Sequence, residues 1–196
     1  MKQILGAAVA LAILSCGVIV PVDAQGKRRT IDGQRSVIIV RVYKSGLFSI
    51  FAHDHEIKAP IDRGEIDDSQ NPSVEFWVDA GKLRVVDSDL SANDRAEVQT
   101  TMEGPKVLAT DRFPQIHFRS TTIQKTGAGH WIVRGELDLH GNTRPVEVAV
   151  TEQDGSYRGS ATLKQRDFGI SPVSIAGGTV KVKDSVTVEF EVVAAR

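Results

Sequence analysis

The feature that most constrains this chain is the alternation of apolar and polar residues with a period of two. At Ile38, Val40 and Val42, apolar side chains share one face of an extended segment, while Arg41 lies on the other. Successive side chains of a strand point to opposite faces, so such a segment predicts a strand with one buried and one solvated face. Similar segments lie at 74–79, 116–119, 131–139, 146–151, 157–164 and 186–192.

Turn signals separate these segments, among them Asn71-Pro72, Gly141-Asn142 and Asp154-Gly155. About eight strands with short, hairpin-like connections favour an all-β fold, either an antiparallel barrel or a sandwich. Apolar residues make up 41% of the chain, too many for a disordered chain and too few for a polytopic membrane protein. The sequence shows no repeat or linker after its first segment, so we expect one domain over residues 30–196.

One segment departs from the alternation. Ser91 is a residue type that caps helices, acidic residues follow it, and Gly104-Pro105 is a stop signal. This pattern predicts one short helix over residues 91–102, and a brief helical turn over 105–108 could follow it.

The first 24 residues have the pattern of a secretory signal peptide. A lysine near the start precedes an apolar run, Pro21 interrupts that run, and Val22-Asp23-Ala24 fits a cleavage site. We therefore expect a bacterial signal peptide over 1–24 and a periplasmic or secreted mature protein. Cys16 leaves an alternative open, because cleavage before it would give a lipidated N-terminus and a membrane anchor. Without that anchor, a membrane would serve this protein only as a source of lipid.

Charge and motif content exclude several functional classes. The 24 basic and 25 acidic residues nearly cancel, so the chain has no strongly basic footprint for nucleic acid. A single cysteine excludes an intrachain disulfide and a multi-cysteine zinc site. Asp167-Phe168-Gly169 matches a kinase tripeptide, but the other kinase elements are absent from the sequence. We expect no enzyme activity and no cofactor.

Two histidines form the most unusual local pattern. On a strand over 49–57, Phe51, His53, His55 and Ile57 would share the inward face. Buried imidazoles need hydrogen-bond partners. The pair could chelate a metal, although the sequence suggests no further ligand, could be hydrogen-bonded at the rim of the core, or could anchor the polar head of a ligand.

The order of several stretches resembles the YceI-like lipid/polyisoprenoid-binding family of secreted bacterial proteins. The stretches are GLFSIFAHDH at 46–55, DRFPQIHFRS at 111–120, GELDLHGNTRPV at 135–146 and QRDFGI at 165–170. This resemblance implies an eight-stranded antiparallel, lipocalin-like barrel around an elongated apolar tunnel. It also implies that the ligand is an isoprenoid or a similar amphipathic lipid. The His53-Asp54-His55 segment departs from the family pattern, so contacts to a lipid head group are not transferred from the family.

The inward faces of the expected strands give a candidate lipid-binding wall. We assign to it, together with His53 and His55, the residues Val40, Phe51, Phe76, Phe118, Val133, Leu137, Val148, Ala161, Leu163 and Phe190. Small inward residues, including Gly135 and Gly159, would leave volume for an apolar guest. A barrel filled entirely by side chains is the alternative.

Two functions remain open from the sequence. The first is a non-catalytic, secreted binding protein for an isoprenoid-type lipid. The second is a metal-binding or redox-assisting protein that uses His53 and His55 on the same barrel.

Overall fold

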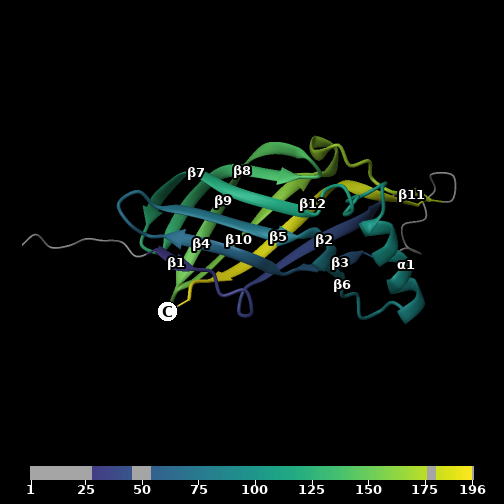
Figure 1. Cartoon of the computed structure of the whole chain (residues 1–196), viewed down its shortest axis with the longest axis horizontal. Coiled ribbons are helices and arrows are strands. Elements are labelled where there is room, and N and C mark those ends of the chain that lie inside the picture. Colours follow the sequence, from purple (N-terminus) through teal and green to yellow (C-terminus); the bar gives the residue numbers. More distant parts are fainter. Residues whose placement is uncertain (1–27, 46–53, 176–179, 196) are drawn as a thin grey trace, which may run out of the picture.

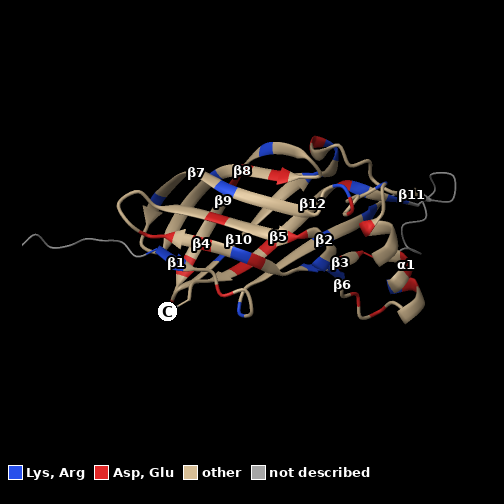
Figure 2. Ribbon diagram, in the orientation of Figure 1, with Lys and Arg blue, Asp and Glu red and all other residues tan. Residues whose placement is uncertain are grey.

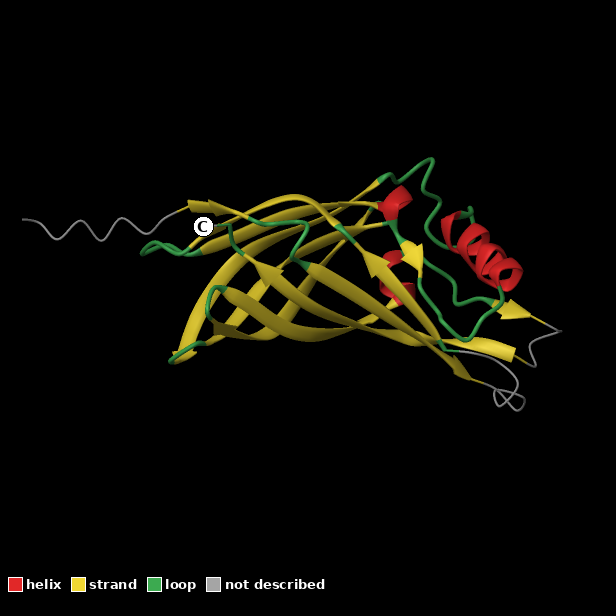
Figure 3. Ribbon diagram, turned by 90° about the horizontal axis from the view of Figure 1, so that it is seen from below, coloured by secondary structure: helices red, strands yellow, loops and turns green. Residues whose placement is uncertain are grey.

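Antiparallel strands make up most of the protein in a computed structural model, which describes residues 28–45, 54–175 and 180–195. The strands curl around a common interior, and one helix, α1, lies outside one end of them (Figures 1 and 3). The strands are β1 (Arg28–Thr30), β2 (Val37–Ser45), β3 (His55–Ala59), β4 (Ile61–Asp67), β5 (Ser73–Asp79), β6 (Arg84–Val85), β7 (Gln115–Gly127), β8 (His130–Leu139), β9 (Asn142–Gln153), β10 (Ser156–Lys164), β11 (Ser174–Ile175) and β12 (Val180–Val193). The helices are α1 (Ala92–Glu103) and two short 3₁₀ helices, η2 (Ala80–Lys82) and η3 (Gln165–Phe168).

All strand pairs are antiparallel, and the strands form one sheet in the order β1-β4-β5-β7-β8-β9-β10-β12-β2-β3-β6, with β11 paired to β12. The prediction of an all-β antiparallel barrel is confirmed. The predicted number of eight strands differs from the count along this path, which is eleven.

Interruptions explain the difference in strand number. Pro60 alone separates β3 from β4, and it cannot donate a hydrogen bond to a ladder. In the same way η2 separates β5, which pairs with β4, from β6, which pairs with β3. Residues 31–36 separate β1, which pairs with β4, from β2, which pairs with β3. If each interrupted pair is counted as one strand, the eleven strands reduce to the expected eight.

The same pairs close the sheet on itself. Because β3 continues into β4, the two ends of the strand order meet at Pro60. The C-terminal end of β12 also contacts the chain next to β1. The Ala195 N–H donates to the Thr30 carbonyl over 2.8 Å, and the Asp32 N–H donates to the Val193 carbonyl over 2.8 Å. The wall is therefore a barrel rather than a sandwich.

The helix forms where the sequence predicts it. The Ser91 side chain accepts a hydrogen bond from the Asp94 N–H, which caps the first turn. On the inner face of α1, Met102 is buried and the Gln99 side chain bonds Leu83 and Val85, which tie the helix to β6. The prediction of a brief helical turn over 105–108 is wrong, because these residues form non-helical turns.

Side chains fill the half of the barrel that lies next to α1. The buried cluster there joins Ile57, Leu83, Val85, Met102 and Phe168. Phe168 is 2% exposed, and its carbonyl accepts hydrogen bonds from the side chain of Asn142 and faces His140 Nδ1. These contacts hold η3 against the β8–β9 turn. The Asp167-Phe168-Gly169 tripeptide thus has a packing role in this fold.

Basic and acidic residues are both spread along the strands (Figure 2). Ion pairs join neighbouring strands, as between Arg41 and Glu56 at 2.6 Å and between Arg158 and Glu191 at 2.6 Å. The Arg158 hydrogen bond holds the pKa of Glu191 below its usual value. In the part of the chain that the structure describes, no helix is long and apolar enough to span a bilayer.

Candidate functional site

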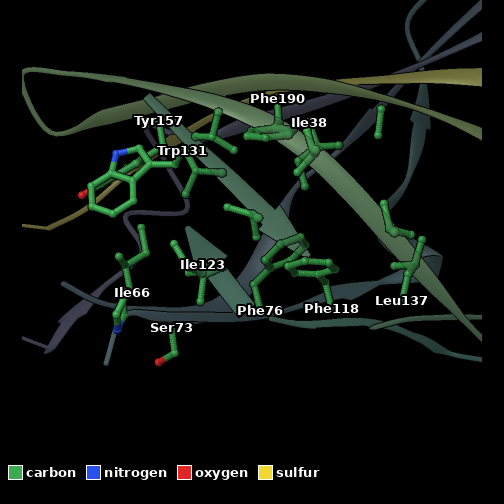
Figure 4. Close-up of a pocket in the computed structure, with 18 of the residues that line it drawn as sticks. Ile38, Ile66, Ser73, Phe76, Phe118, Ile123, Trp131, Leu137, Tyr157 and Phe190 are labelled. Atoms are coloured by element: carbon green, nitrogen blue, oxygen red, sulfur yellow. The ribbon is translucent and has the colours of Figure 1, made fainter. Parts of the chain in front are cut away.

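The half of the barrel away from α1 encloses a cavity of about 180 Å³ (Figure 4). Strands from all around the barrel contribute to its wall, because each turns alternate residues inward. The lining residues are Ile38, Ile66, Asp67, Asp68, Pro72, Ser73, Val74, Phe76, Phe118, Ile123, Trp131, Val133, Leu137, Val146, Val148, Val150, Tyr157, Ala161, Leu163, Val188, Phe190 and Val192. The wall is almost entirely apolar.

The size of the cavity limits what fits in it. An apolar cavity of about 150 Å³ in another protein stays dry and binds benzene or xenon. Pockets for drug-sized ligands usually measure about 300–1,000 Å³. The cavity of about 180 Å³ is therefore suited to a slender apolar group such as one hydrocarbon chain.

Two aromatic rings, from β5 and β7, lie next to each other in the cavity wall. Phe76 and Phe118 lie with their ring centroids 5.4 Å apart. The Phe118 ring covers Gly135, where a Cβ atom would lie 2.5 Å from Cζ of that ring. Phe190 covers Gly159 in the same way, at 2.8 Å. The prediction that both glycines leave volume for a guest is wrong, because neighbouring phenylalanine rings occupy that space.

The structure brings most of the predicted wall together. Among the predicted lipid-binding residues, the cavity is lined by Phe76, Phe118, Val133, Leu137, Val148, Ala161, Leu163 and Phe190. Val40 instead packs against the filled core next to α1. Phe51 and His53 lie outside the described residues. Whether the lining residues contact a lipid stays a prediction.

His55 is not among the residues that line the cavity, and its contact with a lipid head group stays a prediction. It begins β3, whose last residue, Ala59, pairs with the cavity residue Ile38. Four residues of strand span about 13 Å, so His55 lies at the α1 end of the barrel, beyond the buried Ile57. Inward-facing residues on one strand can lie at opposite ends of a barrel, so the period of two does not determine which end His55 occupies.

A buried carboxylate holds His55 in place. His55 Nδ1 lies 2.7 Å from Asp87 Oδ2, and Asp87 Oδ1 accepts the Glu56 N–H over 2.5 Å. The Asp87 side chain is 2% exposed, so these hydrogen bonds satisfy a group that water does not reach. This arrangement matches the hydrogen-bonded histidine that the sequence analysis considered at the rim of the core.

The other described histidines also contact protein groups. His117 Nε2 lies 2.9 Å from Glu75 Oε1, His130 Nδ1 lies 2.7 Å from the Ala128 carbonyl, and His140 Nδ1 lies 3.1 Å from the Phe168 carbonyl. Within residues 28–45, 54–175 and 180–195, no group of three or more acidic, histidine or cysteine side chains is placed to hold a metal ion. A metal site that includes His53 remains a hypothesis, since that residue is not described.

Polar groups gather at the end of the cavity that faces away from α1. Trp131 and Tyr157 lie at this end (Figure 4), as do Asp67 and Asp68 at the end of β4. Arg29 Nη2 donates to Asp68 Oδ2 over 2.8 Å and to the Tyr157 hydroxyl over 2.9 Å. Asp68 is 41% exposed, so the cavity reaches the protein surface here. We call Arg29, Asp68, Trp131 and Tyr157 the polar end of the cavity.

The residues of the polar end were not among the predicted site residues. The alternation places Trp131 and Tyr157 on inward faces, a signal that could have selected them. β1 spans three residues, so no periodic pattern marks Arg29. Burial raises the pKa of the Tyr157 hydroxyl, and the Arg29 guanidinium opposes that rise.

Solved structures share this fold. The chain superposes on BcnA of Burkholderia cenocepacia with a TM-score of 0.61 and 18% identity, covering 84% of this chain and 99% of that one. It superposes on a structure described as a polyisoprenoid binding domain from Saccharophagus degradans with a TM-score of 0.55 and 11% identity, covering 86% and 98%. At these identities the likeness shows the fold alone.

Sequence comparison gives closer relatives. A protein of Shewanella baltica (strain OS185) described as a UPF0312 protein is 30% identical over 188 residues, which covers 86% of this chain and 87% of the relative. The model of the YceI-like domain matches residues 30–194, which include every described strand except the first two residues of β1. The chain therefore belongs to the family of proteins with a YceI-like domain.

Proposed function

We propose that this protein binds one isoprenoid-type or similarly slender lipid chain in the barrel cavity and catalyses no reaction. The observation that carries this proposal is a nearly apolar cavity that ends against a packed core on one side and reaches the surface on the other. Such a shape accepts a chain lengthwise from one end.

The physical driving force is the removal of the chain from water. Each methylene group buried contributes about 0.8 kcal/mol, so a few isoprene units are enough for stable binding. The Saccharophagus degradans domain, which shares this fold, is described as polyisoprenoid binding. This description supports the same ligand class here.

The proposal includes a location. We infer that residues 1–24 direct export and that the mature protein acts in the periplasm or outside the cell, where it would take its ligand from a membrane or from another carrier. The intact mass of the exported protein tests this. A start near Gln25 supports plain secretion, whereas an acylated start at Cys16 would show an anchored protein instead.

The two tryptophans of the chain allow a direct test of binding inside the barrel. Trp131 lines the cavity. Trp77 lies on the outer face, stacked on His117 at 4.5 Å with the Arg63 guanidinium over its ring at 4.4 Å. The variant Trp77→Phe retains only Trp131, which reports on the cavity. The variant Trp131→Phe retains only Trp77, which reports on the outer face.

Bromododecane is a suitable probe, because bromine quenches tryptophan fluorescence at contact and this molecule has no polar head. We expect saturable quenching in Trp77→Phe, where Trp131 remains, and little quenching in Trp131→Phe, where Trp77 remains. Equal quenching in both variants would indicate adsorption on the outer surface and contradict the proposal. Mass spectrometry of an organic extract of natively purified protein would then identify the natural ligand.

A further inference from the structure

We propose that the polar end of the cavity is a binding site for an uncharged head group with a carbonyl-type acceptor oxygen, while the lipid tail points toward α1. This inference rests on the proposed function and adds the chemistry and the orientation of the ligand. It places the head group at Trp131 and Tyr157, which line the cavity, beside Arg29, which donates to the Tyr157 hydroxyl. This site is at the opposite end of the barrel from His55.

Among the described residues, the polar end of the cavity has buried donors that lack partners. Arg29 Nε and Trp131 Nε1 are both inaccessible to solvent and have no hydrogen-bond partner within the described part of the chain. Buried donors normally have hydrogen-bond partners. Two donors without partners at the same end of an apolar cavity are complementary to an acceptor atom of a ligand. Both groups can only donate, so the matching ligand atom is an acceptor such as a carbonyl oxygen.

Charged groups of both signs lie around these donors. The Arg29 guanidinium already pairs with the Asp68 carboxylate at 2.8 Å. Lys125 Nζ lies 5.3 Å from the centre of the Trp131 ring, and the Glu152 carboxylate, like that of Asp68, raises the pKa of Tyr157. Asp67 also lines this end of the cavity and lies 3.8 Å from Arg28, so three carboxylates and three cations are close together here. A diphosphate head would be repelled by these carboxylates, whereas an uncharged acceptor oxygen would not.

The cavity runs from the polar end toward the filled core, which sets the direction of the ligand. At its other end, Leu137 and Leu163 pack against the filled core around Phe168 and Met102. A polar head at that end would lose its hydration without gaining partners. The tail therefore lies against the leucines, and the head remains near the exposed Asp68.

Three probes with related chains test this assignment: farnesylacetone, the hydrocarbon in which its carbonyl is replaced by methylene, and farnesyl diphosphate. Their affinities are measured by competition with the neutral dye N-phenylnaphthylamine. The decisive variant is Trp131→Phe, which retains an aromatic ring and removes the donor. A second variant, Arg29→Lys, removes the Nε donor and retains the charge that pairs with Asp68.

We expect Trp131→Phe to weaken farnesylacetone about threefold to tenfold more than it weakens the hydrocarbon, the effect of one lost hydrogen bond. Arg29→Lys should likewise weaken the binding of farnesylacetone more than that of the hydrocarbon. Trp77→Phe, the same substitution on the outer face, should change neither affinity. Thermal unfolding of each variant establishes that it is folded.

The outcomes separate the two proposals. If the hydrocarbon binds but both variants weaken it and the ketone equally, the head-group site is overturned and the lipid-binding function stands. If farnesyl diphosphate binds more tightly than the ketone and loses more affinity in Arg29→Lys, the site takes an anion and the assignment of an uncharged head is wrong. If no probe binds, both proposals fail.

Discussion

Filling the cavity from its wall would show whether the barrel is hollow where the structure shows it to be. Ala161 lies in β10 opposite Val188 of β12, and both residues line the cavity. The substitution Ala161→Phe would direct an aromatic ring into the cavity of about 180 Å³ and leave the number of tryptophans unchanged.

The expected change in stability follows from two opposing terms. Burying a phenylalanine side chain stabilises a protein by about 1.5–3 kcal/mol, and fitting extra volume into a formed interior costs about 1–3 kcal/mol. In a hollow barrel these terms nearly cancel, so the free energy of unfolding should stay within about 1 kcal/mol of the parent value. In a filled barrel the cost of about 1–3 kcal/mol appears without compensation.

A matched substitution at a residue of the filled core provides the control. Ala59 is 4% exposed, belongs to the buried core and does not line the cavity, so a phenylalanine ring there would have to displace packed side chains. We expect urea denaturation to show a clear loss of stability for Ala59→Phe and almost none for Ala161→Phe. In bromododecane titrations with Trp77 replaced, Ala161→Phe should abolish quenching of Trp131. Equal destabilisation of both variants, with quenching unchanged in Ala161→Phe, would refute the hollow half-barrel.

Three further predictions concern interactions that stabilise the barrel. Gly135→Ala would place a Cβ 2.5 Å from a neighbouring phenylalanine ring, so we expect about 1–3 kcal/mol of destabilisation in urea and weaker probe binding. Asp87→Ala removes the acceptor that faces His55 and leaves a backbone N–H without its partner, which should cost about 1–3 kcal/mol, while Asp87→Asn should recover part of it. Arg158 holds the pKa of Glu191 below its usual value, so the stability from this pair is present above the ordinary glutamate pKa and is lost as pH falls through the lowered value. Glu191→Gln should therefore flatten the acid side of a plot of stability against pH.

Each of these predictions has a contradicting result. A Gly135→Ala variant with parental stability would show that the ring moves aside at no cost. An Asp87→Asn variant no more stable than Asp87→Ala would mean that the carboxylate charge, rather than the acceptor, supports His55. An unchanged acid slope in Glu191→Gln would mean that the exposed Arg158–Glu191 pair contributes nothing to folding, as is true of many surface ion pairs.

The sequence by itself determined the strands and their inward faces. Phe76, Phe118 and Val133 line the cavity as their alternation predicts, because the period of two is a local property of extended backbone. Ser91 and the following residues likewise fixed the start of α1, since a helix cap needs a side chain and an N–H that are three residues apart.

The tertiary structure decided where each residue lies along the axis of the barrel. His55 and Phe76 both face inward in the sequence pattern, yet one lies beside the packed core and the other in the cavity. Alternation gives the side of the wall and not the position along its axis, which the strand register and the break at Pro60 set.

The polar end of the cavity shows the same limit most clearly. Arg29 and Tyr157 are 128 residues apart in the chain and share a hydrogen bond because the barrel closes. Gly135 and Gly159, small positions in the sequence, are covered by the rings of Phe118 and Phe190 from neighbouring strands. The local pattern determined which residues form the wall, and the closure of the sheet decided where it is hollow, because free volume depends on side chains from several strands packing together.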